Sequence, residues 1–249
     1  MRKNILITGA SSGLGAGMAR EFAKRGRNLA LCARRTERLE TLRGELLQQY
    51  PGIKVLIQPL DVDDHEQVFA VFKAFTQELG GLDRVIVNAG LGKGQPVGTG
   101  NFFRANRKTA MTNFVSALAQ CEAAVEIFRE QKQGHLVVIS SMSAMRGMPR
   151  NLTTYAATKA GIAALAEGIR ADLMRTKIKV STIYPGYIRS EINEKVKNTP
   201  FMIDTETGCK ALAAAIEQEP AEAAVPKWPW KPLGMAMRHL PLQIVSRMG

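Results

Sequence analysis

Short apolar runs alternate along this chain with longer stretches that have helical periodicity. Such alternation predicts β-α-β units with right-handed crossovers and a mostly parallel sheet, because each helix returns the chain to the same edge of the sheet. The expected strands are 4–8, 28–33, 54–59, 82–88, 135–140, 179–184 and a short 223–226. The expected helices are 13–25, 36–50, 64–79, one or two within 106–131, 154–176 and 205–218.

Several of the expected strands are apolar without a break, as in Val85-Ile86-Val87. Unbroken apolar strands are typical of a sheet whose two faces are both covered by helices. We therefore expect an α/β fold of the Rossmann type, in which a single domain over residues 1–225 forms a doubly wound parallel sheet. Ligands of such sheets bind beyond the carboxyl ends of the strands, so the residues that follow each strand should carry the chemistry.

A glycine-rich turn follows the first expected strand and leads into the first helix. Glycines permit a sharp turn and a close approach to a ligand, and the start of a helix offers free N–H groups to a pyrophosphate. The turn is a variant of the dinucleotide-binding fingerprint, with three residues instead of one between its first two glycines. A tight connection without a ligand is the alternative, but the strand–turn–helix setting favours a dinucleotide. The sequence of the turn is Thr8-Gly9-Ala10-Ser11-Ser12-Gly13-Leu14-Gly15.

Two arginines follow the second expected strand. NAD-binding proteins of this architecture usually carry an Asp or Glu there, which holds the ribose hydroxyls. Here the strand ends Cys32-Ala33-Arg34-Arg35, without a carboxylate. The two guanidinium groups suit the 2′-phosphate of NADP(H). We therefore favour NADP(H), against the alternative that both arginines only begin a solvated helix.

A tyrosine and a lysine stand four residues apart near the start of the long helix at 154–176. Tyr155 and Lys159 therefore share one face of that helix. A neighbouring ammonium is expected to lower the pKa of a phenol, and the pair could then exchange a proton with a carbonyl or alcohol oxygen. A surface pair without coupling is the alternative. Polar residues expected at the same edge favour the first interpretation: Asn88-Ala89-Gly90, Asn113 and Ser140-Ser141.

Taken in order, these motifs resemble those of the classical short-chain dehydrogenase/reductase family. Each motif is moderately informative, whereas the ordered set is highly specific. The resemblance implies an NADP(H)-dependent oxidoreductase that interconverts a carbonyl and an alcohol by hydride transfer, acting as a homodimer or homotetramer. The match covers roughly residues 3–190 and comprises Thr8-Gly9-x3-Gly13-x-Gly15, Asp61-Val62, Asn88-Ala89-Gly90, Asn113, Ser141, Tyr155-x3-Lys159 and Pro185-Gly186.

The resemblance also implies roles for the matching residues. Tyr155 would be the general acid/base, and Lys159 would bind the nicotinamide ribose and lower the pKa of the tyrosine. Ser141 would hydrogen-bond the substrate oxygen, and Asn113 would anchor a water molecule that connects Lys159 to solvent. The residues expected to contact the cofactor are Gly9, Ser11, Ser12, Gly13, Leu14, Gly15, Arg34, Arg35, Asp61, Val62, Asn88, Ala89, Gly90, Tyr155, Lys159, Pro185, Gly186, Ile188 and Ser190.

The serine departs from the family pattern. Family members usually place it thirteen residues before the tyrosine, and this chain has Met142 at that position. We prefer Ser141, because it directly follows the expected strand and a loop longer by one residue is easily accommodated. Ser140 and Ser143 stay open as alternatives.

Composition argues against several other classes. The three cysteines form no CxxC pair and the three histidines have no metal-binding spacing, so no metal site is expected. The net charge is +12, but the basic residues are dispersed and no nucleic-acid motif is present, so no nucleic-acid partner is expected. Without a signal peptide or an apolar run of roughly 18 residues, the sequence predicts a cytoplasmic protein.

Residues 226–249 combine both tryptophans of the chain with four cationic Lys or Arg residues and no acidic residue. We expect this C-terminal extension to pack on the domain or on another subunit; peripheral contact with a membrane surface is the alternative. Its interior prolines argue against one long helix.

Three segments are expected to shape the substrate site: 91–101, 142–154 with Met145 and Met148, and a lid at about 189–205. Because methionines adapt to irregular apolar ligands, we favour an apolar or lipid-like substrate, with ordinary loop packing as the alternative. A non-catalytic NADP-binding sensor or scaffold and a membrane-associated lipid-metabolising reductase are the alternative functions.

Overall fold

The computed structural model describes residues 2–92, 94–191 and 201–247. Over these residues the chain forms a seven-stranded sheet in the order β3-β2-β1-β4-β5-β6-β7, and every neighbouring pair is parallel. The predicted fold class is therefore confirmed. The strands are β1 (Asn4–Thr8), β2 (Asn28–Ala33), β3 (Val55–Pro59), β4 (Arg84–Val87), β5 (Gln133–Ile139), β6 (Lys177–Pro185) and β7 (Glu222–Val225).

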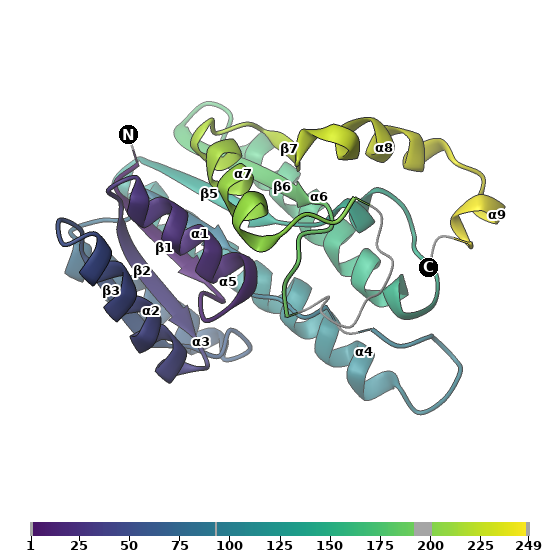
Figure 1. Ribbon diagram of the computed structural model, residues 1–249, viewed down its shortest axis with the longest axis horizontal. Coiled ribbons are helices and arrows are strands. Elements are labelled where there is room, and N and C mark those ends of the chain that lie inside the picture. Colours follow the sequence, from purple (N-terminus) through teal and green to yellow (C-terminus); the bar gives the residue numbers. More distant parts are fainter. Residues whose placement is uncertain (1, 93, 192–200, 248–249) are drawn as a thin grey trace.

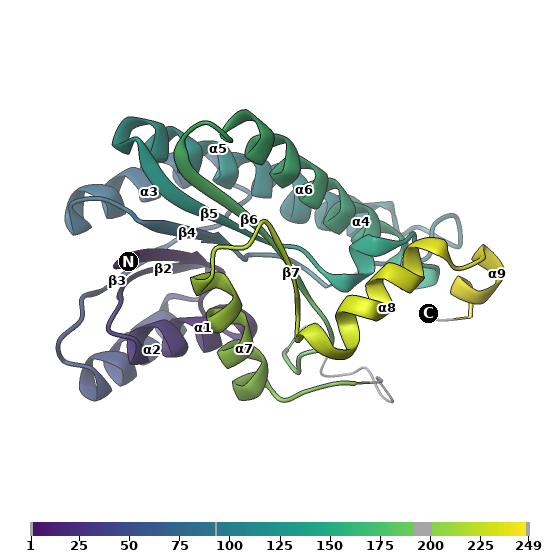
Figure 2. The ribbon, with the colours of Figure 1, turned by 90° about the horizontal axis from the view of Figure 1, so that it is seen from above.

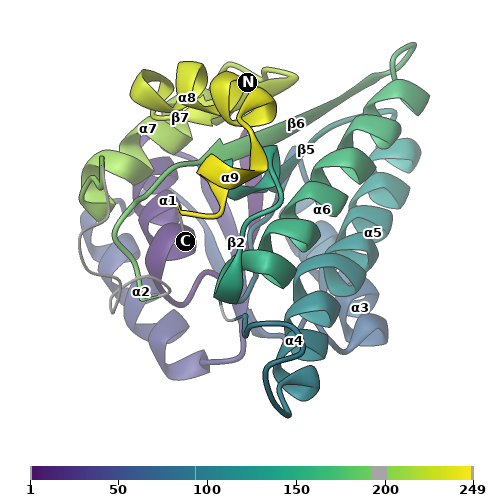
Figure 3. The same ribbon diagram turned by 90° about the vertical axis from the view of Figure 1, so that its right-hand side faces the viewer.

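Helices cover both faces of the sheet (Figures 1, 2 and 3). One face carries α1 (Gly13–Lys24), α2 (Thr36–Gln49) and α7 (Thr205–Glu217). The other carries α3 (His65–Leu79), α5 (Ser116–Gln131) and α6 (Thr153–Asp172). The helix α4 (Phe103–Ala110) precedes α5 and extends beyond the sheet.

Successive strand residues pack into opposite cores, since side chains alternate across a strand. Ile5 and Ile7 contact the cluster under α1, α2 and α7, whereas Leu6 contacts the cluster under α3, α5 and α6. All three side chains are fully buried. This two-sided burial explains why the strands read as continuous apolar runs.

The order of the strands fixes where a ligand can bind. From β1 the chain winds outward to β2 and β3, and it then returns to the other side of β1 with β4. The carboxyl ends of β1 and β4 therefore lie side by side while their following segments diverge, which is the usual ligand crevice of such sheets.

The C-terminal extension forms α8 (Lys227–His239), with non-helical backbone at Trp228, and a short α9 (Leu242–Val245). Both lie at the opposite end of the molecule from α2 and β3 (Figure 1). Trp230, Gly234 and Met237 are buried, and a Cβ on Gly234 would lie 2.5 Å from the terminal methyl of Met142. One face of α8 is thus part of the core next to the segment that follows β5.

A buried polar network lies near the amino-terminal ends of the central strands β4 and β5. The fully buried Arg84 donates from Nε to Nδ1 of His135 (2.8 Å), and its guanidinium also pairs with Glu217 (3.2 Å). Because Nδ1 accepts, Nε2 carries the proton and donates to Ser181 Oγ, 2.8 Å away. Burial, followed by the charge of Arg84, lowers the pKa of His135 to about 3.

This network predicts a pH-dependent loss of stability. The unfolded chain takes up a proton on His135 near its ordinary pKa of about 6.5, whereas the folded chain does so only near about 3. Stability should therefore fall as the pH is lowered through that window. The free energy of unfolding, measured with urea, should fall less between pH 7 and pH 4 for His135→Asn than for the wild type. The variant should already be less stable than the wild type at pH 7. His239→Asn, at an exposed position of α8, is the control that should keep the wild-type slope; equal slopes for all three proteins would contradict the assignment.

Candidate active site

The glycine turn after β1 is held against the end of β4. Gly9 and Gly13 have positive φ angles of 66° and 52°. A Cβ on Gly9 would lie 2.8 Å from the Cα of Ala89, and one on Gly15 would lie 2.3 Å from the carbonyl oxygen of Gly9. Larger residues at these positions would force the turn away from the sheet.

The amino-terminal end of α1 suits an anion. Its N-cap Ser12 makes no side-chain capping hydrogen bond, and no acidic residue stands in the first turn. Neither the Ser12 side chain nor an acidic residue of the first turn therefore satisfies the backbone N–H groups at this end of the helix, where the helix dipole is positive. Leu14, in the same first turn, packs against the core and anchors the start of the helix.

The residues after β4 brace this turn. Asn88 donates from Nδ2 to the carbonyl oxygen of Thr8 (2.9 Å), and the backbone N–H groups of Asn88 and Ala89 donate to Thr8 Oγ1 (3.0 and 3.1 Å). Gly90 follows, and a Cβ there would lie 3.2 Å from Asn113 Oδ1 and 3.6 Å from Lys159 Nζ. The segment 88–90 therefore connects the glycine turn with the predicted catalytic residues.

The two arginines after β2 have different surroundings. Arg34 is exposed, whereas Arg35 donates from Nε to Ser11 Oγ (3.3 Å) and from Nη2 to Ser12 Oγ (2.6 Å). Arg35 also pairs with Glu191 (3.1 Å), and Arg38 pairs with the other oxygen of the same carboxylate. The sequence-based prediction did not distinguish Arg34 from Arg35 and did not include Arg38. The signal for Arg38 was its position three residues after Arg35, which places both residues on one face of the helix.

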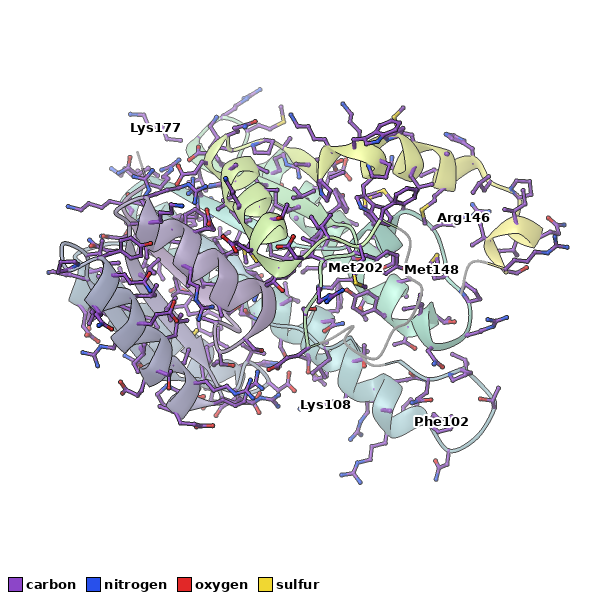
Figure 4. All side chains as sticks on the ribbon, in the orientation of Figure 1. Phe102, Lys108, Arg146, Met148, Lys177 and Met202 are labelled. Atoms are coloured by element: carbon purple, nitrogen blue, oxygen red, sulfur yellow. The ribbon has the colours of Figure 1, made fainter. Side chains whose placement is uncertain are left out.

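Asp61 and Val62 follow β3 next to the end of β2, where Leu60 N–H donates to the carbonyl oxygen of Ala33 (3.0 Å). The Asp61 carboxylate accepts from the N–H of Asp63 (3.2 Å). Asp63 in turn accepts from Ser116 Oγ (2.6 Å) and pairs with Lys108 on α4, which Figure 4 labels. This contact fixes the segment after β3 to the helices on that face.

Asn113 lies in a π-helical turn, Met111–Val115, between α4 and α5. Its buried side chain accepts from the Leu91 N–H (2.7 Å) and donates to the Leu91 carbonyl oxygen (2.8 Å). A contact of 3.4 Å to Thr158 Oγ1 extends to α6. Single π-turns occur frequently at functional sites. The sequence predicted a helix here but gave no signal for the π-turn.

Three serines follow β5 or stand close behind it. Ser140 is buried and donates to the carbonyl oxygen of Lys159 (2.7 Å). The Ser141 side chain lies close enough to Tyr155 to act against the rise of its pKa, and Ser141 Oγ accepts from Oγ of Ser143 (3.0 Å). Ser141 thus lies between Tyr155 and Ser143, while Ser140 ties β5 to α6.

The Lys159 ammonium lies over one face of the tyrosine ring. Its Nζ donates to the carbonyl oxygen of Ile139 (2.8 Å) and lies 5.9 Å from the centre of the Tyr155 ring. Burial lowers the pKa of Lys159 to about 8.

The predicted lowering of the tyrosine pKa is wrong for this structure. Burial raises the pKa of Tyr155 above its ordinary value, and the interaction with the Ser141 side chain opposes this only in part. The physical reason is geometric: the Lys159 ammonium lies over the ring and bonds Ile139, and burial costs more for the charged phenolate than for the phenol.

The segment after β6 crosses the same edge. Pro185 ends the strand, and the Gly186 N–H donates to the carbonyl oxygen of Val225 (2.9 Å). Ile188 is buried, and Ser190 approaches the glycine turn, since a Cβ on Gly13 would lie 3.4 Å from the Cβ of Ser190. Of the predicted lid at 189–205, residues 192–200 lie outside the described part of the chain.

Two aromatic residues that the sequence did not single out as site residues stand beside Gly186. Trp230 of α8 is buried, and its Nε1 would lie 2.1 Å from a Cβ on Gly186. Its ring meets the Tyr187 ring edge-on at 5.4 Å between centroids. The predicted Met148 is buried in a neighbouring cluster with Met237 of α8. Figure 4 places Arg146 and Met148 in the region between α8 and α6. The helical spacing of Trp230, Leu233 and Met237 was the available sequence signal.

Comparison with known proteins identifies the family. A family model described as short chain dehydrogenase matches residues 3–200. The chain is a member of the short-chain dehydrogenase family. An oxidoreductase of Mycobacterium tuberculosis is 53% identical over 246 residues, which cover 99% of this chain and 97% of that protein. The family membership predicted from the motifs is confirmed, and the chain is an oxidoreductase of this family.

Solved structures of the family share the fold. An alcohol dehydrogenase of the archaeon Thermococcus sibiricus, in complex with 5-hydroxy-NADP, has a TM-score of 0.79 at 25% identity and covers 89% of this chain and 95% of its own. A short-chain dehydrogenase/reductase of Burkholderia phymatum, in complex with NAD, has a TM-score of 0.84 at 18% identity, covering 98% and 95%. The same architecture thus accommodates both dinucleotides in these relatives.

The described residues hold no group of three or more His, Cys, Asp or Glu side chains that could bind a metal ion. Among the described helices, none is both long enough and apolar enough to cross a membrane.

The contacts of the three serines predict different mutant effects. Ser141→Ala should lower kcat by about tenfold to a thousandfold, because it removes the hydroxyl that acts on the Tyr155 phenol. Ser140→Ala should mainly lower the melting temperature, because it removes a buried hydrogen bond between β5 and α6. Ser143→Ala should have a small effect on kcat. Steady-state kinetics and thermal unfolding of the three variants test this, and a larger kcat loss in Ser143→Ala than in Ser141→Ala would exchange their roles.

Proposed function

We propose that this protein is an NADP(H)-dependent carbonyl reductase or alcohol dehydrogenase that acts on an apolar substrate. The observation that carries the proposal is the grouping of Ser141, Tyr155 and the buried Lys159 at the strand edge that also holds the glycine turn: Ser141 acts on the Tyr155 phenol, and Lys159 Nζ lies 5.9 Å from the centre of the Tyr155 ring. When bound, the nicotinamide cofactor supplies or accepts the hydride.

The residues at this edge fit such a cofactor. The close-packed glycines and the amino-terminal end of α1 suit a pyrophosphate, with Ser11 and Ser12 beside it. Asp61 and Val62 would flank the adenine, and Asn88, Ala89 and Gly90 would support the turn. Lys159 would bind the ribose next to the nicotinamide, and Pro185, Gly186, Ile188 and Ser190 would line the carboxamide side.

Tyr155 is suited to act as the proton donor in carbonyl reduction. Burial raises its pKa, so the phenol keeps its proton at neutral pH. In this proposal Tyr155 donates that proton to the developing alkoxide while Ser141 holds the same oxygen by a hydrogen bond. Asn113, which spans from Leu91 to α6, would position a water molecule on the path from Lys159 to solvent.

The preference for NADP(H) rests on Arg35 and Arg38. The Arg35 guanidinium bonds the serines of the glycine turn, and both Arg35 and Arg38 already contact a carboxylate, that of Glu191. Arginine side chains bind phosphate oxygens with well-defined geometry. No carboxylate follows directly on β2 to hold the ribose hydroxyls of NAD(H).

The apolar surroundings favour an apolar substrate. Met142 follows Ser141 in the chain and packs in one apolar cluster with Trp230 and Tyr187, whose rings meet edge-on. In this proposal the C-terminal extension therefore belongs to the substrate end of the site. A lipid-like substrate is the more specific form of the same proposal.

Exposed apolar side chains support a homo-oligomer. Phe103, Met111, Phe114 and Val115 are all exposed on α4 and on the π-turn that follows it. Covering them with a second copy would remove apolar surface from water. The exposed side of α8 and α9, with Trp228, suits contact with a second subunit or with a membrane surface.

A Tyr155→Phe variant tests the enzymatic function. It removes the proton-carrying oxygen and keeps the ring, so we expect carbonyl reduction to fall by about a thousandfold or more. NADPH affinity, measured by fluorescence titration, should change little. The assay is NADPH consumption over a panel of aliphatic aldehydes, steroids, retinoids and 3-oxoacyl thioesters. Wild-type protein that binds NADPH but reduces none of them would favour the non-catalytic sensor or scaffold, and full activity of the variant would remove Tyr155 from the chemistry.

An Arg35→Ala variant tests the cofactor preference, with the exposed neighbour Arg34→Ala as the matched control. Loss of one charge-assisted phosphate contact should weaken NADPH binding by about tenfold to a hundredfold and leave NADH binding nearly unchanged. Dissociation constants for both cofactors provide the measurement. An equal change of the NADPH dissociation constant in the two variants would show that Arg35 has no particular role in binding the 2′-phosphate.

A further inference from the structure

A carboxylate of the chain itself lies between the two arginines. Glu191 pairs through Oε2 with Arg35 (3.1 Å) and through Oε1 with Arg38. Arg35 also donates from Nη2 to Oγ of Ser12, at the start of α1 (2.6 Å). Two guanidinium groups therefore converge on one anionic side chain, and one of them also bonds the glycine turn.

These are the donors that a phosphate monoester would use. Arginine forks bind carboxylate and phosphate oxygens in the same geometry, so one anion can replace the other. We propose that Glu191 competes with the 2′-phosphate of NADP(H) for Arg35 and Arg38, and that this competition limits how strongly the protein prefers NADP(H) over NAD(H). The inference rests on the proposed cofactor preference and adds a specificity-determining residue to it.

The balance between the two anions follows from charge and exposure. The ion pairs of Glu191 are exposed, with side-chain exposures of 40–48%, so water and salt weaken them. A phosphate monoester carries up to two negative charges and more acceptor oxygens than a carboxylate, so it can displace Glu191. The displacement still costs the existing pairs, and the affinity for the 2′-phosphate is lower by that amount.

Glu191 stays charged over the working range of the enzyme. The hydrogen bond from Arg38 is the largest cause that lowers the pKa of this carboxyl, to about 2, with Ser12 and Arg35 contributing in the same direction. The competitor is therefore present at every pH at which the protein is assayed.

Glu191 also links the arginines to the segment after β6. The preceding residue, Ser190, lies against the glycine turn, and Ile188 is buried against Gly208 of α7. The backbone before Glu191 is thus held in place, which keeps its carboxylate within reach of Arg35 and Arg38. A competitor fixed in this way acts at high effective concentration.

The test is an isosteric Glu191→Gln variant of the full chain, probed with adenosine 2′,5′-bisphosphate and with adenosine 5′-monophosphate by titration calorimetry. The bisphosphate carries the 2′-phosphate and the monophosphate lacks it. The variant should bind the bisphosphate about threefold to tenfold more tightly and the monophosphate unchanged. NADPH and NADH dissociation constants should change in the same pattern.

Glu40→Gln is the matched control, because Glu40 forms an exposed ion pair with Arg43 on the same helix as Arg38. It should leave both dissociation constants unchanged. Equal melting temperatures of the three proteins would show that the substitutions leave the fold intact.

Two outcomes would overturn the inference while the proposed function stands. Bisphosphate affinity could stay unchanged in Glu191→Gln although Arg35→Ala weakens it, in which case the carboxylate does not compete. It could also fall in Glu191→Gln, in which case Glu191 orders the arginines for phosphate instead of opposing it. If neither the wild type nor Arg35→Ala distinguishes the bisphosphate from the monophosphate, the proposed NADP(H) preference fails, and the inference fails with it.

Discussion

The pairing of β1 with β4 at the centre of the sheet is the constraint on which the site depends. The chain reverses its direction of winding there, so the segments that leave the two strands separate at one edge. The approach of Gly9 to Ala89 and the bonds from Asn88 to Thr8 fix these segments against each other. Without this contact, the positions of the glycine turn and of Ser141 and Tyr155 would not be fixed relative to each other.

Burial decides the electrostatics at the edge of the sheet. The sequence argument considered only the attraction between an ammonium and a phenolate, which lowers the pKa of a phenol. In the folded chain both Tyr155 and Lys159 are desolvated, and burial disfavours the charged form of each. The tyrosine is therefore kept protonated, and the same low-dielectric surroundings lower the pKa of the lysine to about 8.

Charge is distributed differently at the two edges of the sheet. At the amino-terminal edge, Arg84 and His135 are buried and their polar atoms are satisfied by Glu217 and Ser181, so this network contributes to stability. At the carboxyl edge, Arg35 and Arg38 are exposed and contact Glu191. Exposed pairs exchange partners readily, whereas a buried network does not. The same residue types are thus structural at one edge and available to a ligand at the other.

The sequence by itself determined the alternation of strands and helices, the parallel sheet, the glycine turn and the family, because these depend on local periodicity and on motifs in a fixed order. It also placed Ser141, Tyr155 and Lys159 at one edge, since carboxyl ends of parallel strands meet there. Only the tertiary structure separated Ser141 from Ser140, and Arg35 from Arg34. It also brought Arg38, Glu191 and Trp230 to the site and placed Asn113 in a π-turn. The physical reason is that direction, burial and long-range contact of a side chain are set by the packing of distant segments, which no local pattern encodes.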